Sequence, residues 1–130
     1  MPVKTVSKKK KKKILIIEDY PATVELMNTL LSPNGFEIIV ACDGKIGIEK
    51  AVSEKPDLIL LDVMMPEMGG IEVLKKLMSN PKTAKIPVVI VSVRVGAEDI
   101  RAGKDAGAVE YIGKPFEPAE LLEIAKKHLG

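Results

Sequence analysis

Four apolar segments of this 130-residue chain are each followed by side chains that could do chemistry. In chain order these side chains belong to Glu18, Asp19, Asp62, Ser92 and Lys114. Asp62 is the central one, because it ends the run LILL, whose turn-forming flanks are typical of a strand buried on both faces. A carboxylate at the tip of such a strand, with a loop behind it, lies where open α/β sheets hold their ligands.

Three carboxylates that share one crevice repel one another. At about 4 Å and an effective dielectric constant near 20, each pair costs on the order of 4 kcal/mol. Oxygen-only ligands suit a hard cation, and Mg²⁺ accepts a few carboxylates while it keeps several waters. With Mg²⁺ bound and Lys114 nearby, a phosphoryl group could be held between positive charges while an Asp62 oxygen attacks it. The Ser92 hydroxyl could donate a hydrogen bond to that group.

The elements that must position these side chains alternate along the chain. Strands are predicted at residues 14–17, 37–41, 58–61, 88–91 and 109–112, and helices at 21–31, 45–52, 71–78, 97–106 and 118–129. This alternation predicts an α/β fold, (βα)5, with a doubly wound parallel five-stranded sheet in the flavodoxin-like order 2-1-3-4-5. Strands 1, 3, 4 and 5 are neighbours in that order, so the candidate groups meet at the carboxyl edge of the sheet.

The charge of the chain is divided unevenly along the sequence. Lys4 and the run from Lys8 to Lys13 hold seven of the 20 basic residues, and the remainder carries 13 basic against 18 acidic residues. We therefore predict a basic tail at residues 1–12 and one folded domain at residues 13–130. A lysine run can contact nucleic acid or anionic lipid. We favour a solvated tail, with no direct nucleic-acid contact and no membrane contact.

Composition sets further limits on the class of protein. The chain is 46% hydrophobic and 29% charged, which is typical of a soluble globular protein, and it has no apolar run long enough to span a membrane. One cysteine, Cys42, excludes an internal disulfide, so we expect a reducing, cytoplasmic location. We expect Cys42 to be a small buried side chain. His128, the only histidine, is expected to be a surface or packing residue.

Four motifs together resemble a known family. They are the acidic pair in IIED, the aspartate and loop of LLDVMMPEMGG, the hydroxyl of VIVS, and the aromatic residue and lysine of YIGKPF. The intervals of 30 residues from Asp62 to Ser92 and 52 from Asp62 to Lys114 fit the same pattern. Over about residues 13–129 the chain resembles the CheY-like receiver domain of two-component response regulators.

That resemblance implies roles for the acidic residues. Asp62 would be the phosphoacceptor, taking a phosphoryl group from a histidine kinase or a small acyl phosphate. Asp19, Asp62 and the backbone carbonyl of Met64 would hold Mg²⁺, and Glu18 would reach the ion through a water. We also consider the acidic pair, Asp19 in particular, as a cap for the first helix.

The resemblance also implies roles for the residues around the lysine. Lys114 would pair with the phosphate, and its peptide bond to Pro115 would be cis. Ser92 and Tyr111 would form the switch pair, in which the hydroxyl moves toward the phosphate and the ring swings inward. Val93 departs from the family pattern, which more often has alanine after the hydroxyl residue.

The implied function is a phosphorylation-dependent signalling switch and not an enzyme, apart from catalysis of its own phosphorylation and dephosphorylation. The expected partners are a sensor histidine kinase or phosphotransfer protein, and a downstream protein that binds the face formed by residues 97–107, residues 109–112 and the last helix. A homodimer formed on phosphorylation is left open. We expect a receiver without an output domain, either stand-alone or cut from a longer regulator.

Two other functions compete with this interpretation. A phosphatase that works through an aspartyl-phosphate commonly has a second aspartate two residues after the nucleophile, and Met64 occupies that position here. A flavodoxin-like cofactor binder would need a phosphate-cradling loop after the first strand. The residues there, EDYPAT, are acidic and would repel phosphate unless a metal intervened.

Overall fold

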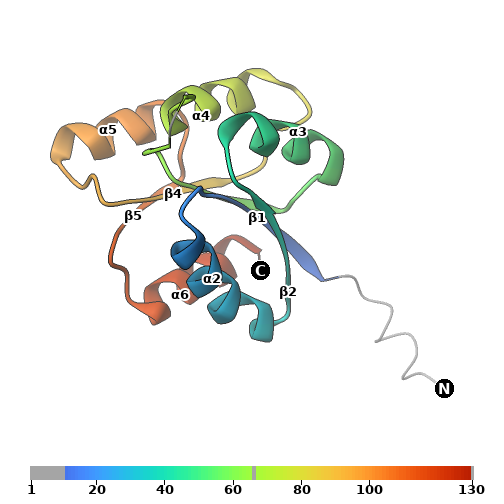
Figure 1. Cartoon of the computed structure of the whole chain (residues 1–130). Helices are drawn as coiled ribbons and strands as arrows, with labels where there is room; N and C mark the ends of the chain where they lie inside the picture. The colour runs from blue at the N-terminus through green and yellow to red at the C-terminus, as the bar shows by residue number, and fades with distance from the viewer. Residues whose placement is uncertain (1–10, 66, 130) are drawn as a thin grey trace.

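The computed structural model describes residues 11–65 and 67–129, which contain one five-stranded parallel sheet. The strands lie in the order β2-β1-β3-β4-β5, which confirms the predicted fold class and strand order (Figure 1). Their bounds are β1 (Lys12–Ile17), β2 (Phe36–Ala41), β3 (Leu58–Leu61), β4 (Val88–Ser92) and β5 (Glu110–Gly113). Parallel neighbours require crossover connections, and the intervening helices provide them.

Helices cover both faces of this sheet, as the sequence predicts. Figure 1 shows α3, α4 and α5 on one side and α2 and α6 on the other. The helices are α2 (Pro21–Leu31), α3 (Gly44–Glu54), α4 (Gly70–Ser79), α5 (Ala97–Asp105) and α6 (Pro118–Leu129), with a short 3₁₀ turn at Ser32–Asn34. Pro21 occupies the first turn of α2, where its missing N–H costs nothing.

The sheet divides the core into two layers, and the interior strand β1 contributes side chains to both. Successive side chains of a strand point to opposite faces, so Ile14 and Ile16 pack with α2 and α6 while Leu15 and Ile17 pack toward α3 and α4. All four side chains are fully buried. A strand buried on both faces holds its carboxyl end rigidly, and that end carries the acidic pair.

The predicted strand boundaries differ from the observed ones by one or two residues. β1 begins at Lys12 and not at residue 14, and β5 begins at Glu110, so Val109 lies outside the strand and is exposed. The structure describes no residue before Lys11, so most of the predicted tail lies outside the described residues. The division between tail and domain stays a prediction.

The polar fourth helical segment does form a helix, α5. Glu98 and Asp99 in its first turn and Lys104 in its last complement the helix dipole. Gly103 faces the sheet, where a Cβ would lie 2.6 Å from Ile90 Cδ1 and 3.1 Å from the Tyr111 ring. The glycine therefore allows α5 to approach the sheet closely.

Two local predictions are wrong. The N-cap of α2 is Tyr20, whose side chain makes no capping bond, so Asp19 does not cap the helix. Cys42 is exposed and not buried, because it follows the last residue of β2, an edge strand, and lies in the turn before α3. Asp43 in that turn caps α3, accepting a hydrogen bond of 2.8 Å from the Ile46 N–H. No helix in the described ranges is long and apolar enough to cross a membrane.

Candidate functional site

Backbone pairing brings the acidic residues to one edge of the sheet. The Glu18 N–H donates to the Ala41 carbonyl and the Asp62 N–H donates to the Ile17 carbonyl, each at 3.0 Å. These bonds fix the residues that follow β1 and β3 side by side. Glu18, Asp19 and Asp62 each offer a carboxylate oxygen within 4.8 Å of the other two. The carboxylates that the sequence predicts to meet therefore do lie together.

Burial raises the free-energy cost of keeping the carboxylates of this cluster charged. Glu18 is 2% and Asp62 6% exposed. Burial raises the pKa of Glu18, and the neighbouring Asp62 charge raises it further, whereas the hydrogen bond from Lys114 acts in the opposite direction. Lys114 Nζ lies 2.7 Å from Glu18 Oε1 and 3.7 Å from Asp62 Oδ2. One lysine thus offsets part of the repulsion among three carboxylates.

Lys114 is positioned by the end of β5. Its N–H donates to the Ser92 carbonyl at 2.8 Å, which continues the pairing of β5 with β4 beyond the last strand residue. The peptide bond to Pro115 is cis, as the family resemblance implies. The Lys114 side chain is 15% exposed, so it reaches into the crevice and not out to solvent. The ion pair with Glu18 was not foreseen from the sequence.

The loop after Asp62 is held against the start of α4. The Met64 N–H donates to Asp62 Oδ1 at 3.0 Å, so the loop backbone fixes one oxygen of the carboxylate. A Cβ on Gly70 would lie 2.5 Å from the Asp62 carbonyl oxygen, so only glycine allows α4 to begin this close to the loop. The loop therefore orients the Asp62 carboxylate toward the crevice.

The donor set fits a hard divalent cation. In the described residues the cluster consists of carboxylates alone, with no cysteine or histidine among them. Three carboxylate oxygens within this spacing suit an ion that keeps part of its water shell, as Mg²⁺ does. Asp19 is the solvent-accessible member of the cluster, whereas Glu18 and Asp62 are buried.

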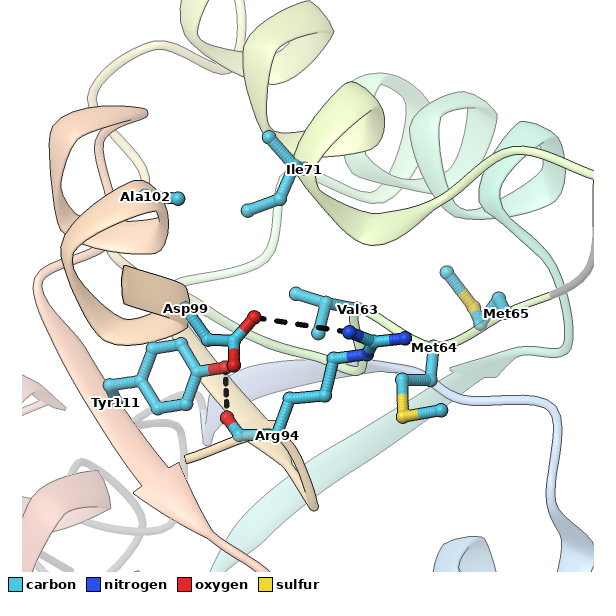
Figure 2. Close-up of a pocket in the computed structure, with 8 residues that line it drawn as sticks. All are labelled: Val63, Met64, Met65, Ile71, Arg94, Asp99, Ala102 and Tyr111. Atoms are coloured by element: carbon cyan, nitrogen blue, oxygen red, sulfur yellow. Dashed lines mark hydrogen bonds and ion pairs between the residues drawn. The ribbon is translucent and has the colours of Figure 1, made fainter. Parts of the chain in front are cut away.

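The two predicted switch residues are joined by a third residue, Arg94. The Ser92 side chain is fully buried and its hydroxyl oxygen accepts a hydrogen bond of 3.1 Å from the Arg94 N–H. The Tyr111 hydroxyl donates to the Arg94 carbonyl, and the Arg94 guanidinium lies 4.0 Å from the Asp99 carboxylate (Figure 2). Sequence reasoning missed Arg94, although its place two residues after Ser92 was a signal.

A pocket opens beside these residues. It measures about 540 Å³ and runs from the loop after Asp62 to the first turns of α5 (Figure 2). Its lining comprises Val63, Met64, Met65, Ile71, Arg94, Asp99, Ala102 and Tyr111. Burial at this pocket raises the pKa of the Tyr111 hydroxyl. The pocket thus connects the Asp62 loop with α5 and with the ring of Tyr111.

The fold and this site can be compared with known proteins. A family model described as the response regulator receiver domain matches residues 14–126. The chain belongs to this family. Receiver domains are signalling modules of two-component systems and not classical enzymes, and they act with histidine kinases and downstream partners.

Individual relatives agree with this assignment. The chain is 39% identical over 110 residues to the alkaline phosphatase synthesis regulatory protein PhoP of Bacillus subtilis, a match that covers 85% of this chain and 45% of that protein. A CheY-like receiver domain protein of Methanospirillum hungatei superposes with a TM-score of 0.85 at 31% identity, covering 92% and 94% of the two chains. Chemotaxis protein CheY4 of Vibrio cholerae gives 0.86 at 28% identity, covering 91% and 98%.

The receiver domain corresponds to part of most curated relatives. The chain spans about half the length of several of them and about a quarter of the response regulator PleD of Caulobacter vibrioides. Receiver domains typically bind Mg²⁺ in an acidic pocket, and in this chain the acidic cluster is Glu18, Asp19 and Asp62. The structure brings all the predicted side chains to one edge; their individual roles stay predictions.

Proposed function

We propose that this receiver domain is a phosphorylation switch whose phosphoacceptor is Asp62. The observation that carries the proposal is the setting of the Asp62 carboxylate. It is almost fully buried at the end of a central strand, beside two further carboxylates and 3.7 Å from a lysine ammonium. A carboxylate in that setting can act as a nucleophile, because positive charge next to it can bind the incoming group.

The transfer step would join Asp62 to phosphorus. One oxygen of its carboxylate forms a bond to phosphorus while the bond from phosphorus to the donor breaks. The electron pair of that bond stays with the donor atom, which is the imidazole nitrogen of a phosphohistidine or the oxygen of a small acyl phosphate. Transfer therefore needs no oxidant and no other co-reactant, and the product is an aspartyl phosphate.

Several residues would support this step. Asp19, Asp62 and the Met64 carbonyl would hold Mg²⁺, with Glu18 reaching it through a water. The ion supplies positive charge that offsets repulsion between the phosphoryl oxygens and the carboxylates. Lys114 now pairs most closely with Glu18, and a dianionic group on Asp62 would attract its ammonium away from that partner.

The phosphate would be sensed through Ser92 and Tyr111. A phosphoryl oxygen on Asp62 would accept a hydrogen bond from the Ser92 hydroxyl, whose oxygen now accepts one from the Arg94 N–H. The Arg94 carbonyl also accepts a hydrogen bond from the Tyr111 hydroxyl. Rotation of the Ser92 side chain would therefore shift Arg94, and with it Tyr111 and α5. The two packings need differ by only a few kcal/mol for one phosphate to shift their populations.

The partners follow from this mechanism. We infer that a sensor histidine kinase or a phosphotransfer protein supplies the phosphoryl group in the cytoplasm, and that a downstream protein reads the face formed by α5, β5 and α6. A homodimer through the same face is the alternative output. The proposal holds equally for a receiver that acts alone and for one within a longer regulator.

Intact-mass measurement tests the proposal. The chain is incubated with Mg²⁺ and a small acyl phosphate, in parallel with Asp62→Asn. Wild type should gain one phosphoryl mass, and the variant should gain none. Omission of Mg²⁺ should strongly slow the gain. Equal labelling of both proteins would refute the assignment of Asp62.

A further inference from the structure

Lysines gather at the edge of the sheet opposite the acidic crevice, where the strands begin. Lys11, Lys12 and Lys13 enter β1 at this edge, and Lys55 lines the same surface hollow of about 500 Å³ just before β3. Lys82 and Lys85 belong to the turn before β4, whose Pro87 accepts a hydrogen bond from Ile59 of β3. We call these six residues the lysine edge.

The lysine edge rests on ordered backbone. The Lys13 N–H donates to Asp57 Oδ2 at 2.8 Å, and the Lys13 ammonium bonds the Glu54 carbonyl at 3.2 Å. The turn that carries Lys82 is held by its N–H, which donates to Asn80 Oδ1 at 2.9 Å. Its base is fixed by the buried hydroxyl of Thr83, which donates to the Leu77 carbonyl at 2.6 Å. The backbone segments that carry these lysines are therefore held in place.

Positive charge exceeds negative charge at this edge. The described acidic residues at this edge include Glu37, which pairs with Lys13 in register, and Glu54 and Asp57, which line the hollow. Asp105 ends α5, and Glu110 begins β5 and pairs with Lys127. Lys13 is the one member that has an ion pair in the described part of the chain. The other five lysines are exposed, and Lys8, Lys9 and Lys10 precede them directly in the sequence.

We propose that the lysine edge binds the phosphate backbone of duplex nucleic acid without reading the base sequence. Phosphate contacts by clustered lysines release counterions, and that release supplies the affinity of sequence-independent binding. The expectation from sequence alone was a solvated tail without nucleic-acid contact. The structure favours nucleic-acid contact instead, because it places Lys55, Lys82 and Lys85 beside the end of the lysine run.

The surroundings of the lysine edge favour a duplex over other polyanions. Single strands are bound by stacking on aromatic side chains, and the exposed aromatic residue in the described ranges, Tyr20, lies at the opposite edge. Stable attachment to an anionic membrane needs an apolar or lipid anchor in addition to basic residues. Of the exposed large hydrophobic residues in the described ranges, only Val109 lies at the amino ends of the strands.

Fluorescence anisotropy with a labelled duplex of arbitrary sequence tests this proposal on the full chain. For about four phosphate contacts, wild-type affinity should fall on the order of 100-fold between 50 and 200 mM salt. The triple variant Lys55→Gln, Lys82→Gln, Lys85→Gln should bind about tenfold or more weakly at 50 mM and show a shallower salt dependence.

The matched control removes the same charge elsewhere, with Lys45→Gln, Lys75→Gln and Arg101→Gln on the exposed faces of α3, α4 and α5. It should bind within about twofold of wild type, and circular dichroism should show that both variants fold. The proposal fails if wild type does not bind at 50 mM salt, or if both triple variants weaken equally. It also fails if the chain binds phosphatidylserine vesicles but not the duplex.

Discussion

The two ends of the sheet each hold a glutamate that faces a lysine, yet the two glutamates are perturbed in opposite directions. At the carboxyl edge, burial raises the pKa of Glu18 in spite of its 2.7 Å bond to Lys114. At the amino edge, the hydrogen bond from Lys127 lowers the pKa of Glu110. An ion pair therefore does not decide the charge state by itself. Burial and nearby like charge decide it.

The carboxylates at the two edges of the sheet also differ in what they contribute, binding at the carboxyl edge and stability at the amino edge. The carboxyl edge concentrates three carboxylates that repel one another, and such a cluster is retained where a cation or a phosphoryl group is to be bound. At the amino edge Glu110 accepts a hydrogen bond from Lys127, and Asp57 accepts one from the backbone N–H of Lys13. Changes to the carboxylates of the first edge should alter Mg²⁺ and phosphoryl binding, and changes to the paired carboxylates of the second should alter stability slightly.

The largest effect is expected from Asp19→Ala on Mg²⁺ binding. Removal of one of three carboxylates should weaken Mg²⁺ binding by about tenfold or more, because ligand charge sets much of the affinity. Relief of repulsion should also raise the melting temperature of the metal-free protein. Titration calorimetry measures the first effect, with Glu54→Gln at the other edge as control. Unchanged Mg²⁺ affinity in Asp19→Ala would show that this metal site is wrong.

A smaller effect, spread over more residues, is expected from Ser92→Ala on the amide chemical shifts. Amide shifts are compared with and without a phosphate mimic in wild type and variant. Both proteins should show changes near Asp62, whereas changes across residues 93–107 and at Tyr111 should be much reduced in the variant. The physical reason is loss of the hydroxyl that links the phosphate to Arg94. Undiminished transmission to α5 would contradict this coupling.

Glu110→Gln should change stability by less than about 1 kcal/mol, since Lys127 is largely exposed. The pKa of Glu110 is lowered in the folded state, so its ion pairs stabilise the fold above the ordinary value of 4.5. That contribution is lost as pH falls through the lowered folded-state pKa. Urea unfolding of both proteins across the acid range measures the difference. We expect the difference in free energy of unfolding between wild type and Glu110→Gln to shrink as the pH falls. A difference that grows as the pH falls would contradict the lowered pKa of Glu110.

The smallest effect on the switch itself is expected from deletion of residues 1–10. The matched motifs all follow these residues, so the phosphorylation rate and melting temperature should stay nearly unchanged. Binding to duplex nucleic acid should weaken, because Lys4 and Lys8 to Lys10 are removed. Thermal melts and acyl phosphate labelling check the first claim. A large loss of either would mean that the tail supports the switch itself.

The fold could be predicted from the sequence because local signals agreed with each other. The apolar run 58–61 coincides with β3, and Pro21 and Pro118 begin α2 and α6. Boundaries at β1 and β5 were less certain because strand ends depend on the partner strand. Lys12 joins β1 through its pairing with Phe36, a contact that no local pattern contains.

The site residues could be listed from the sequence, but not their contacts. Their approach follows from the strand order, which the alternation of elements determines. The pairing of Lys114 with Glu18 depends on side-chain geometry across 96 residues of sequence. The bridge through Arg94 depends on the turn after β4, and the exposure of Cys42 depends on β2 being an edge strand.

The most direct test of the central claim is to locate the phosphoryl group within the chain. Borohydride reduction of the labelled protein converts a phosphorylated aspartate to homoserine, and peptide mass spectrometry then identifies the position. We predict homoserine at residue 62 alone, with Asp19 at the same edge and Asp57 at the opposite edge unmodified. Homoserine at residue 19 or 57 with Asp62 intact would contradict the account.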